Sequence, residues 1–174
     1  PKVTGMNKAP SAPVGIFDSG VGGLTVARAL LNRLPEERLL YFADTAHVPY
    51  GPRPPEEIKG FALDIVAFLM SQGAKAVVMG CNTSSAVALE PARARHGEMV
   101  FGVIGPGARA AIKATKSGRI GVLATQATVS TAAYSKALRA VEPEIDVIEQ
   151  PCPEFVPLVE RGELDSDYTR GVAA

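Results

Sequence analysis

The 174-residue sequence has no tryptophan, only 6% aromatic residues and no excess charge, because 18 basic residues balance 18 acidic ones. A surface that stacks nucleic-acid bases needs aromatic side chains, and a surface that attracts phosphates or anionic lipids needs positive charge. Nucleic acid and membrane lipid are therefore poor candidates for a partner. We expect a small-molecule ligand instead.

Long apolar runs and clustered metal ligands are also missing. The most apolar stretch, residues 61–70, is short and contains Asp64, so it cannot span a bilayer. Prolines interrupt the N-terminal region, which lacks the apolar core of a signal peptide. Without an export signal, we expect a cytoplasmic protein whose two cysteines, Cys81 and Cys152, are reduced. The two histidines and two cysteines lie in four separate segments, so no metal is expected.

What the sequence does have is 47% hydrophobic residues, arranged as short apolar runs that alternate with longer amphipathic ones. Continuous apolar runs are typical of a parallel sheet covered on both faces. The sequence therefore predicts an α/β fold of the doubly wound, flavodoxin-like type. The predicted strands are residues 14–17, 39–43, 76–79, 100–104, 120–123 and 147–148. Predicted helices include residues 23–34, a helix that begins at the prolines 54 and 55 and stops at Gly73, residues 106–115 and residues 128–141.

In doubly wound sheets the chemistry lies in the loops that follow the carboxyl ends of the strands. The first such loop, residues 18–23, is rich in glycine but has Thr25 where a nucleotide fingerprint requires a third glycine. Its backbone amides and the following helix can still bind a carboxylate. Asp18 either orients or deprotonates a neighbouring group or only caps a tight turn.

The third loop, residues 80–85, is the most informative. Cys81 stands where a buried strand ends and a helix begins, and the positive end of a helix stabilises a thiolate. Asn82 and Thr83 add donors suited to a carboxylate. The alternative is a cysteine that only packs, which is the role we expect for Cys152 between two prolines. In the second loop, residues 44–51, His47 is interpreted as a solvent-exposed residue rather than a catalyst.

Taken together, these segments resemble glutamate racemase over nearly the whole chain from residue 14. The resemblance rests on five segments in the same order. They are residues 15–26 with Asp-Ser-Gly-Val-Gly-Gly, residues 44–51 ending in Pro-Tyr-Gly, residues 80–83 (Gly-Cys-Asn-Thr), residues 121–129 and residues 152–160.

The resemblance implies an enzyme that interconverts L- and D-glutamate without pyridoxal phosphate or another cofactor, for peptidoglycan synthesis. Two similar α/β domains would each supply one catalytic cysteine, and the assembly could be a homodimer. By resemblance, Cys81 is the acid/base on one face of the substrate, Asp18 assists it, and Glu160 assists on the opposite face. The positions that match the family's substrate-binding residues are Asp18, Ser19, Pro49, Tyr50, Gly51, Asn82, Thr83, Thr125 and Thr128.

One departure from the family pattern is serious. The second cysteine of the family belongs to a Gly-Cys-Thr-His segment that would follow Ala174. We therefore expect a flexible extension (residues 1–13), a first α/β domain (residues 14–104) and an incomplete second one (residues 105–174), with the boundary near Gly105. Two alternatives stay open: a non-catalytic fragment that at most binds glutamate, and a related aspartate or hydantoin racemase or decarboxylase.

Overall fold

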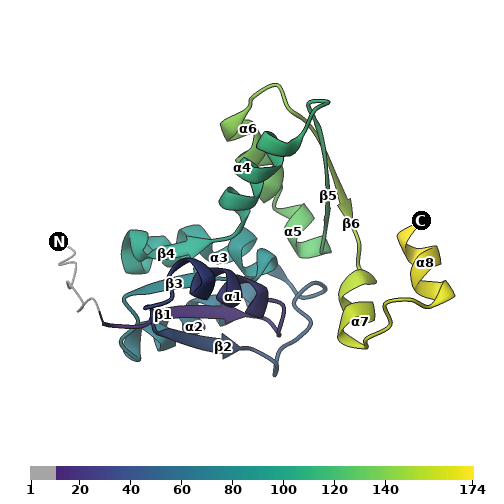
Figure 1. The fold of residues 1–174 in the computed structure, drawn as a ribbon. Coiled ribbons are helices and arrows are strands. Elements are labelled where there is room, and N and C mark those ends of the chain that lie inside the picture. The colour runs from purple at the N-terminus through teal and green to yellow at the C-terminus, as the bar shows by residue number, and fades with distance from the viewer. Residues whose placement is uncertain (1–10) are drawn as a thin grey trace.

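The computed structural model describes residues 11–174, so most of the N-terminal extension predicted above lies outside the described residues. A parallel sheet with the strand order β2-β1-β3-β4 forms the first half of the chain (Figure 1). Phe17 in the central strand pairs with Phe42 on one side and Met79 on the other. The strands are β1 (Val14–Asp18), β2 (Leu39–Ala43), β3 (Ala76–Met79) and β4 (Val100–Gly102).

Helices cover both faces of this sheet. The chain moves outward from β1 to β2 and then back across to β3, so right-handed crossovers place the first helix on one face and the next two on the other. The helices are α1 (Leu24–Arg33), α2 (Pro55–Ser71) and α3 (Asn82–His96), followed by the short 3-10 helix η1 (Gly97–Met99). The main core lies between the sheet and the pair α2 and α3, around Phe17, Val66, Leu69 and Val77. The predicted doubly wound parallel fold is confirmed.

Local chemistry explains why α2 begins and ends where it does. Pro55 occupies its first turn, where no amide partner is needed, and Glu56 and Glu57 lie at the positive end of the helix. Beyond its last turn, Gly73 adopts a positive φ of 88°, a conformation that favours glycine. The helix stop predicted at Gly73 is therefore confirmed.

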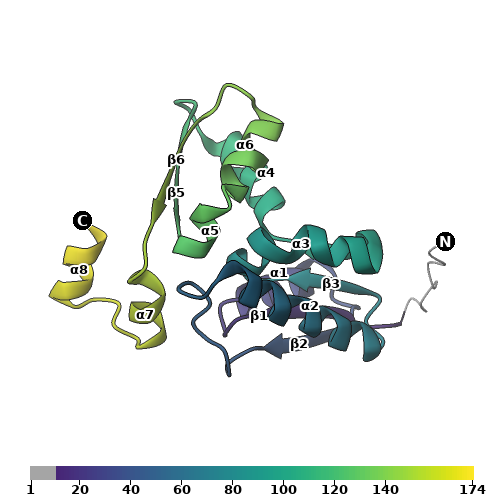
Figure 2. The same ribbon diagram turned by 180° about the vertical axis from the view of Figure 1, so that it is seen from behind.

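A second parallel sheet pairs β5 (Arg119–Ala124) with β6 (Asp146–Pro151). The helices α4 (Ile104–Ala114) and α6 (Ala133–Val141) pack on one face, around Ala108, Leu138 and Ile145. The other face is bare, because Leu123 is 65% exposed and Ile148 is 57% exposed. The expectation that all strands are covered on both faces is thus wrong for β5 and β6 in this chain. The remaining helices α7 (Phe155–Glu160) and α8 (Asp167–Ala173) lie beyond the end of β6 (Figures 1 and 2).

Two predicted elements need correction. The strand expected over residues 100–104 ends at Gly102, because the amide of Val103 bonds to the Ser85 hydroxyl (3.3 Å) and Ile104 already starts α4. The single helix expected over residues 128–141 is divided into α5 (Gln126–Ser130) and α6, because Ala132 between them has a left-handed φ of 51°. The domain boundary predicted at residues 104 and 105 falls at the start of α4 and stays a prediction. Within residues 11–174, no helix combines the length and apolarity needed to cross a membrane.

Candidate active site

The carboxyl ends of β1, β2 and β3 meet at one edge of the first sheet, where their loops line a cavity of about 340 Å³. Eight of the predicted site residues line this cavity. They are Asp18, Ser19, Tyr50, Gly51, Cys81, Asn82, Thr83 and Thr125. The first seven come from the first sheet's loops, and Thr125 comes from the loop after β5. The cavity therefore lies where the two halves of the chain meet.

Cys81 is the N-cap residue of α3 and is 7% exposed. Its sulfur accepts a hydrogen bond from the Ser84 amide (3.4 Å) and donates one to the Ser19 hydroxyl (3.7 Å). An amide donor and the positive end of a 15-residue helix both favour negative charge on the sulfur. The sulfur therefore lies between a helix N-terminal amide and a serine hydroxyl.

Asp18 is the last residue of β1 and is 7% exposed. Its carboxylate accepts a hydrogen bond from the Gly20 amide (3.1 Å). The loop after β1 lies so close to this carboxyl group that a Cβ at residue 23 would come within 2.6 Å of the Asp18 Cβ. Only glycine fits at residue 23, directly before α1. Burial, followed by the charges of Asp18 and Cys81, raises the pKa of Tyr41 to about 12. The Tyr41 hydroxyl therefore stays protonated at neutral pH and donates to the Gly20 carbonyl (3.4 Å).

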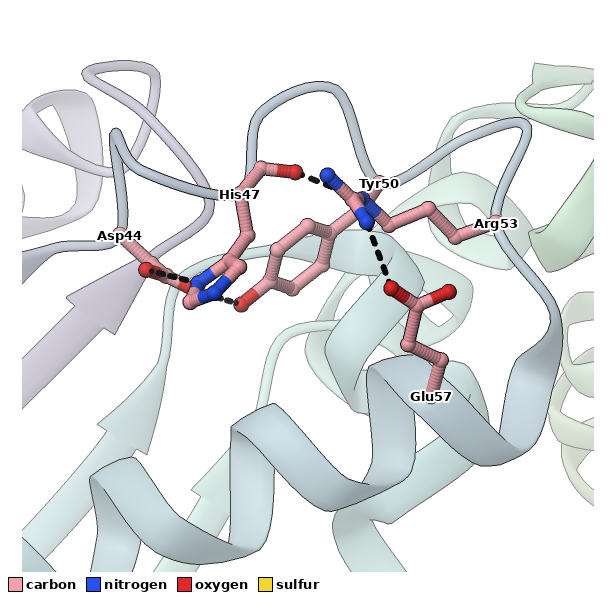
Figure 3. Close-up of polar contacts among 5 residues, drawn as sticks. All are labelled: Asp44, His47, Tyr50, Arg53 and Glu57. Atoms are coloured by element: carbon pink, nitrogen blue, oxygen red, sulfur yellow. Dashed lines mark hydrogen bonds and ion pairs between the residues drawn. The ribbon is translucent and has the colours of Figure 1, made fainter.

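The loop after β2 brings Tyr50 and Gly51 to the cavity. Figure 3 shows Tyr50 of this loop beside Asp44. Tyr50 is 2% exposed, and its hydroxyl donates to the Asp44 carboxylate at 2.5 Å. Burial, the hydrogen bond to Asp44 and nearby negative charge hold the pKa of Tyr50 well above its ordinary value. Its hydroxyl is therefore committed to Asp44, and Tyr50 offers the cavity its ring and backbone. His47, expected to be exposed, is half-buried and bonds to the same carboxylate at 2.7 Å.

Three threonine hydroxyls join the two halves of the chain. Thr83 at the start of α3 lies 3.0 Å from Thr125, and Thr125 lies 3.0 Å from Thr128, hydroxyl to hydroxyl. The hydroxyl of Thr128, which is fully buried, also donates to that of Thr83 at 3.3 Å. Each hydroxyl can both donate and accept, so the group can rearrange its protons around a bound carboxylate. Thr128 itself lines an adjoining cavity of about 400 Å³ that shares Asn82, Thr83 and Thr125 with the first.

Pro49, Glu160 and Cys152 lie outside the lining of the Cys81 cavity. Pro49 and Gly51 line a neighbouring cavity, and a Cβ at residue 51 would lie 3.2 Å from Thr125. Glu160, the exposed last residue of α7, does not line the Cys81 cavity. Its carboxylate nevertheless lies close to Gly20, because a Cβ added to that glycine would be 3.2 Å from it. Cys152 is a half-buried free thiol that donates to the Gln150 carbonyl (3.6 Å) and lines the adjoining cavity.

Sequence reasoning missed Tyr134 of α6, whose hydroxyl donates to the Asn82 side-chain carbonyl at 2.5 Å. This bond fixes the amide so that its NH₂ group is left to donate to a ligand. Nothing local in the sequence signals a contact across 52 positions. Thr25 and Val26 of α1 and Val156 of α7 also line the cavity. Among residues 11–174, no three His, Cys, Asp or Glu side chains are grouped so that they could hold a metal ion.

Comparison with known proteins identifies relatives of this chain. The chain is 50% identical to a glutamate racemase of Exiguobacterium sibiricum over 92% of its own length, and it spans 59% of that protein. Its structure matches a glutamate racemase of Bacillus anthracis (TM-score 0.89, 40% identity, 94% of this chain and 62% of that one). It also matches a Francisella tularensis glutamate racemase solved in complex with D-glutamate (TM-score 0.87, 35% identity, 94% and 61%). The family model described as Asp/Glu/Hydantoin racemase matches residues 24–170, and the chain therefore belongs to that family.

Proposed function

We propose that this chain provides one thiol and most of the substrate-binding residues of a glutamate racemase, which interconverts L- and D-glutamate for peptidoglycan synthesis in the cytoplasm. The observation that carries the proposal is the Cys81 thiol. Its sulfur lies at the N-terminus of α3, within 3.7 Å of the Ser19 hydroxyl and on the same cavity as Asp18, Asn82 and Thr83. The similarity to a relative solved with D-glutamate supports glutamate as the substrate.

Inversion of an α-carbon explains why a thiol is needed. One group must remove the proton from one face, and another must deliver a proton to the opposite face. A thiol whose charge is stabilised can act as both base and acid near neutral pH. We assign the first role to Cys81, with Asp18 beside it, and expect the second thiol in the part of the relatives that this chain does not span. Glu160 would assist on that opposite face.

Negative charge that develops on the substrate carboxylate needs donors, because the proposed reaction uses no cofactor to delocalise it. The backbone amides of the loop after β1 and the side chains of Ser19, Asn82 and Thr83 are suited to the α-carboxylate and the amino group. The linked hydroxyls of Thr83, Thr125 and Thr128 are suited to the second carboxylate. Pro49, Tyr50 and Gly51 would form the opposing wall.

Circular dichroism of glutamate solutions tests the proposal. The protein made from the complete reading frame that contains these residues should erase the optical activity of either enantiomer, and Cys81→Ser should not. Aspartate and a substituted hydantoin serve as alternative substrates, because the family model covers all three classes. Turnover of aspartate or hydantoin in preference to glutamate would reject the substrate assignment. Undiminished turnover by Cys81→Ser would reject the role of the thiol.

A further inference from the structure

A cluster of polar side chains lies behind the wall of the cavity, between the loop after β2 and helix α2 (Figure 3). At its centre is Asp44, 6% exposed, whose carboxylate accepts the Tyr50 hydroxyl at 2.5 Å and the His47 Nδ1 at 2.7 Å. An ionised carboxylate only accepts hydrogen bonds, so Nδ1 of His47 must carry a hydrogen. Asp44 thus has two donors that keep it satisfied although it is buried.

Contacts with helix α2 also hold the segment that carries these two donors, residues 47–53. The His47 ring stacks on Phe61 of α2, with centroids 4.0 Å apart. The Arg53 side chain donates to the His47 carbonyl (2.8 Å) and to Glu57 of α2 (2.6 Å), and its guanidinium lies 5.6 Å from the Phe61 centroid. These contacts attach both ends of the turn formed by residues 47–53 to α2.

The cluster reaches the site through Tyr50. The Tyr50 ring belongs to the same buried group as Cys81, and Tyr50 and Gly51 both line the cavity. The Asp44 amide also donates to the Asp18 carbonyl (3.0 Å), which ties the loop after β2 to the loop that carries Asp18. Movement of Tyr50 would therefore change the cavity wall on the side that faces the thiol.

We propose that Asp44 and His47 are positioning residues: the carboxylate, held by His47, locks the Tyr50 hydroxyl and thereby fixes the Tyr50–Gly51 wall against Cys81. Neither residue lines the Cys81 cavity. The inference rests on the proposed racemase function of the site. It goes beyond that function by assigning roles to residues outside the cavity.

Two substitutions at residue 47 separate the hydrogen bond from the ring. His47→Phe keeps a ring to stack on Phe61 but removes the donor to Asp44. His47→Asn loses the ring but keeps an NH donor near the position of Nδ1. In the protein made from the complete reading frame, His47→Phe should raise the KM for glutamate about tenfold with kcat unchanged, since a buried hydrogen bond is lost from the binding wall. His47→Asn should restore the KM. Tyr50→Phe, which removes a single oxygen, gives the same test if His47→Phe does not fold.

The control is Glu37→Gln, which weakens an ion pair with Lys75 at the opposite, amino end of the sheet. It should lower the melting temperature without changing the KM. A KM that stays at the wild-type value in both His47→Phe and Tyr50→Phe, with activity falling only in step with the folded fraction, would reduce the cluster to a structural role and overturn the inference.

A second measurement does not depend on turnover. In the 174-residue chain, mass spectrometry can follow the alkylation of Cys81 separately from that of Cys152. His47→Phe should accelerate alkylation of Cys81 several-fold, because a loosened Tyr50 exposes the sulfur, and should leave Cys152 unchanged. If the wild-type protein from the complete reading frame fails to racemise glutamate, the proposed function fails, and the alkylation rates then decide the positioning role alone. Equal Cys81 rates in the wild type and the variant would reject it.

Discussion

At the scale of single residues, Cys81 and Cys152 are both free thiols but have different surroundings. The Cys81 sulfur accepts a hydrogen bond from a helix N-terminal amide and donates one to Ser19, whereas the Cys152 sulfur donates one to the Gln150 carbonyl two residues away. Because Cys152 also lines a cavity, its position alone does not separate the two thiols. The difference is that Cys81 caps the N-terminus of α3 and shares its cavity with the Asp18 carboxylate.

Serine substitutions should therefore act differently at the two positions. In the protein from the complete reading frame, Cys81→Ser should abolish racemisation, because a serine hydroxyl is too weak an acid to exchange protons near neutral pH. Cys152→Ser should retain turnover and change only the free energy of unfolding. Optical rotation of glutamate measures the first effect, and urea unfolding measures the second. An equal loss of turnover in a folded Cys152→Ser variant would contradict the assignment.

Because of Tyr41, the free energy of unfolding should change with pH in the alkaline range. Its pKa is raised from 10.0 to about 12 in the folded protein, mainly by burial. Below pH 10 the tyrosine is neutral in both states and its contribution to stability is complete. Between pH 10 and about 12 the unfolded chain loses the proton first, so the free energy of unfolding falls as the pH rises. Tyr41→Phe should reduce this fall in urea unfolding measured across that range. Tyr168→Phe, at an exposed tyrosine of α8, is the matched control.

At the scale of secondary-structure elements, the break between α5 and α6 has a measurable cost. Ala132 adopts a left-handed conformation, which costs an L-residue with a Cβ roughly 1 kcal/mol or more. Ala132→Gly should therefore raise the free energy of unfolding by about 0.5–1 kcal/mol. Ala140→Gly, at an exposed position inside α6, should lower it by about 1 kcal/mol. Urea denaturation measures both free energies. If Ala132→Gly destabilised the protein, the left-handed conformation of Ala132 would not carry the expected cost.

The same elements show what the sequence can predict and why the rest escapes it. The stop of α2 just before Gly73 and the cysteine at the start of α3 follow from local chemistry, which a sequence displays directly. The break at Ala132 does not, because alanine is the residue with the highest intrinsic helix propensity. The bonds of Tyr134 to Asn82 and of His47 and Tyr50 to Asp44 depend on how loops and helices pack, so His47 looked like an exposed loop residue.

At the scale of the whole molecule, the proposed mechanism assigns to the 174 residues one acid/base, Cys81, on one face of the substrate. Incubated with D-glutamate in deuterated water, this chain should exchange the α-proton slowly without loss of optical activity, because Cys81 can remove a proton and return a deuteron to the same face. NMR follows the deuteration, and polarimetry follows the handedness. Cys81→Ser should abolish the exchange. Racemisation by this chain would contradict the picture of one thiol for each face.

The order of the strands also has a consequence for biosynthesis. All strands of the sheet β2-β1-β3-β4 are complete by Gly102, whereas β5 begins only at Arg119. Domains that emerge first from the ribosome fold first, and parallel strands pair slowly because their contacts are distant in sequence. The first sheet can therefore begin its slow pairing while the second is still being translated. The Asp18 and Cys81 loops would then come together on the nascent chain before Thr125 emerges from the ribosome to close the cavity.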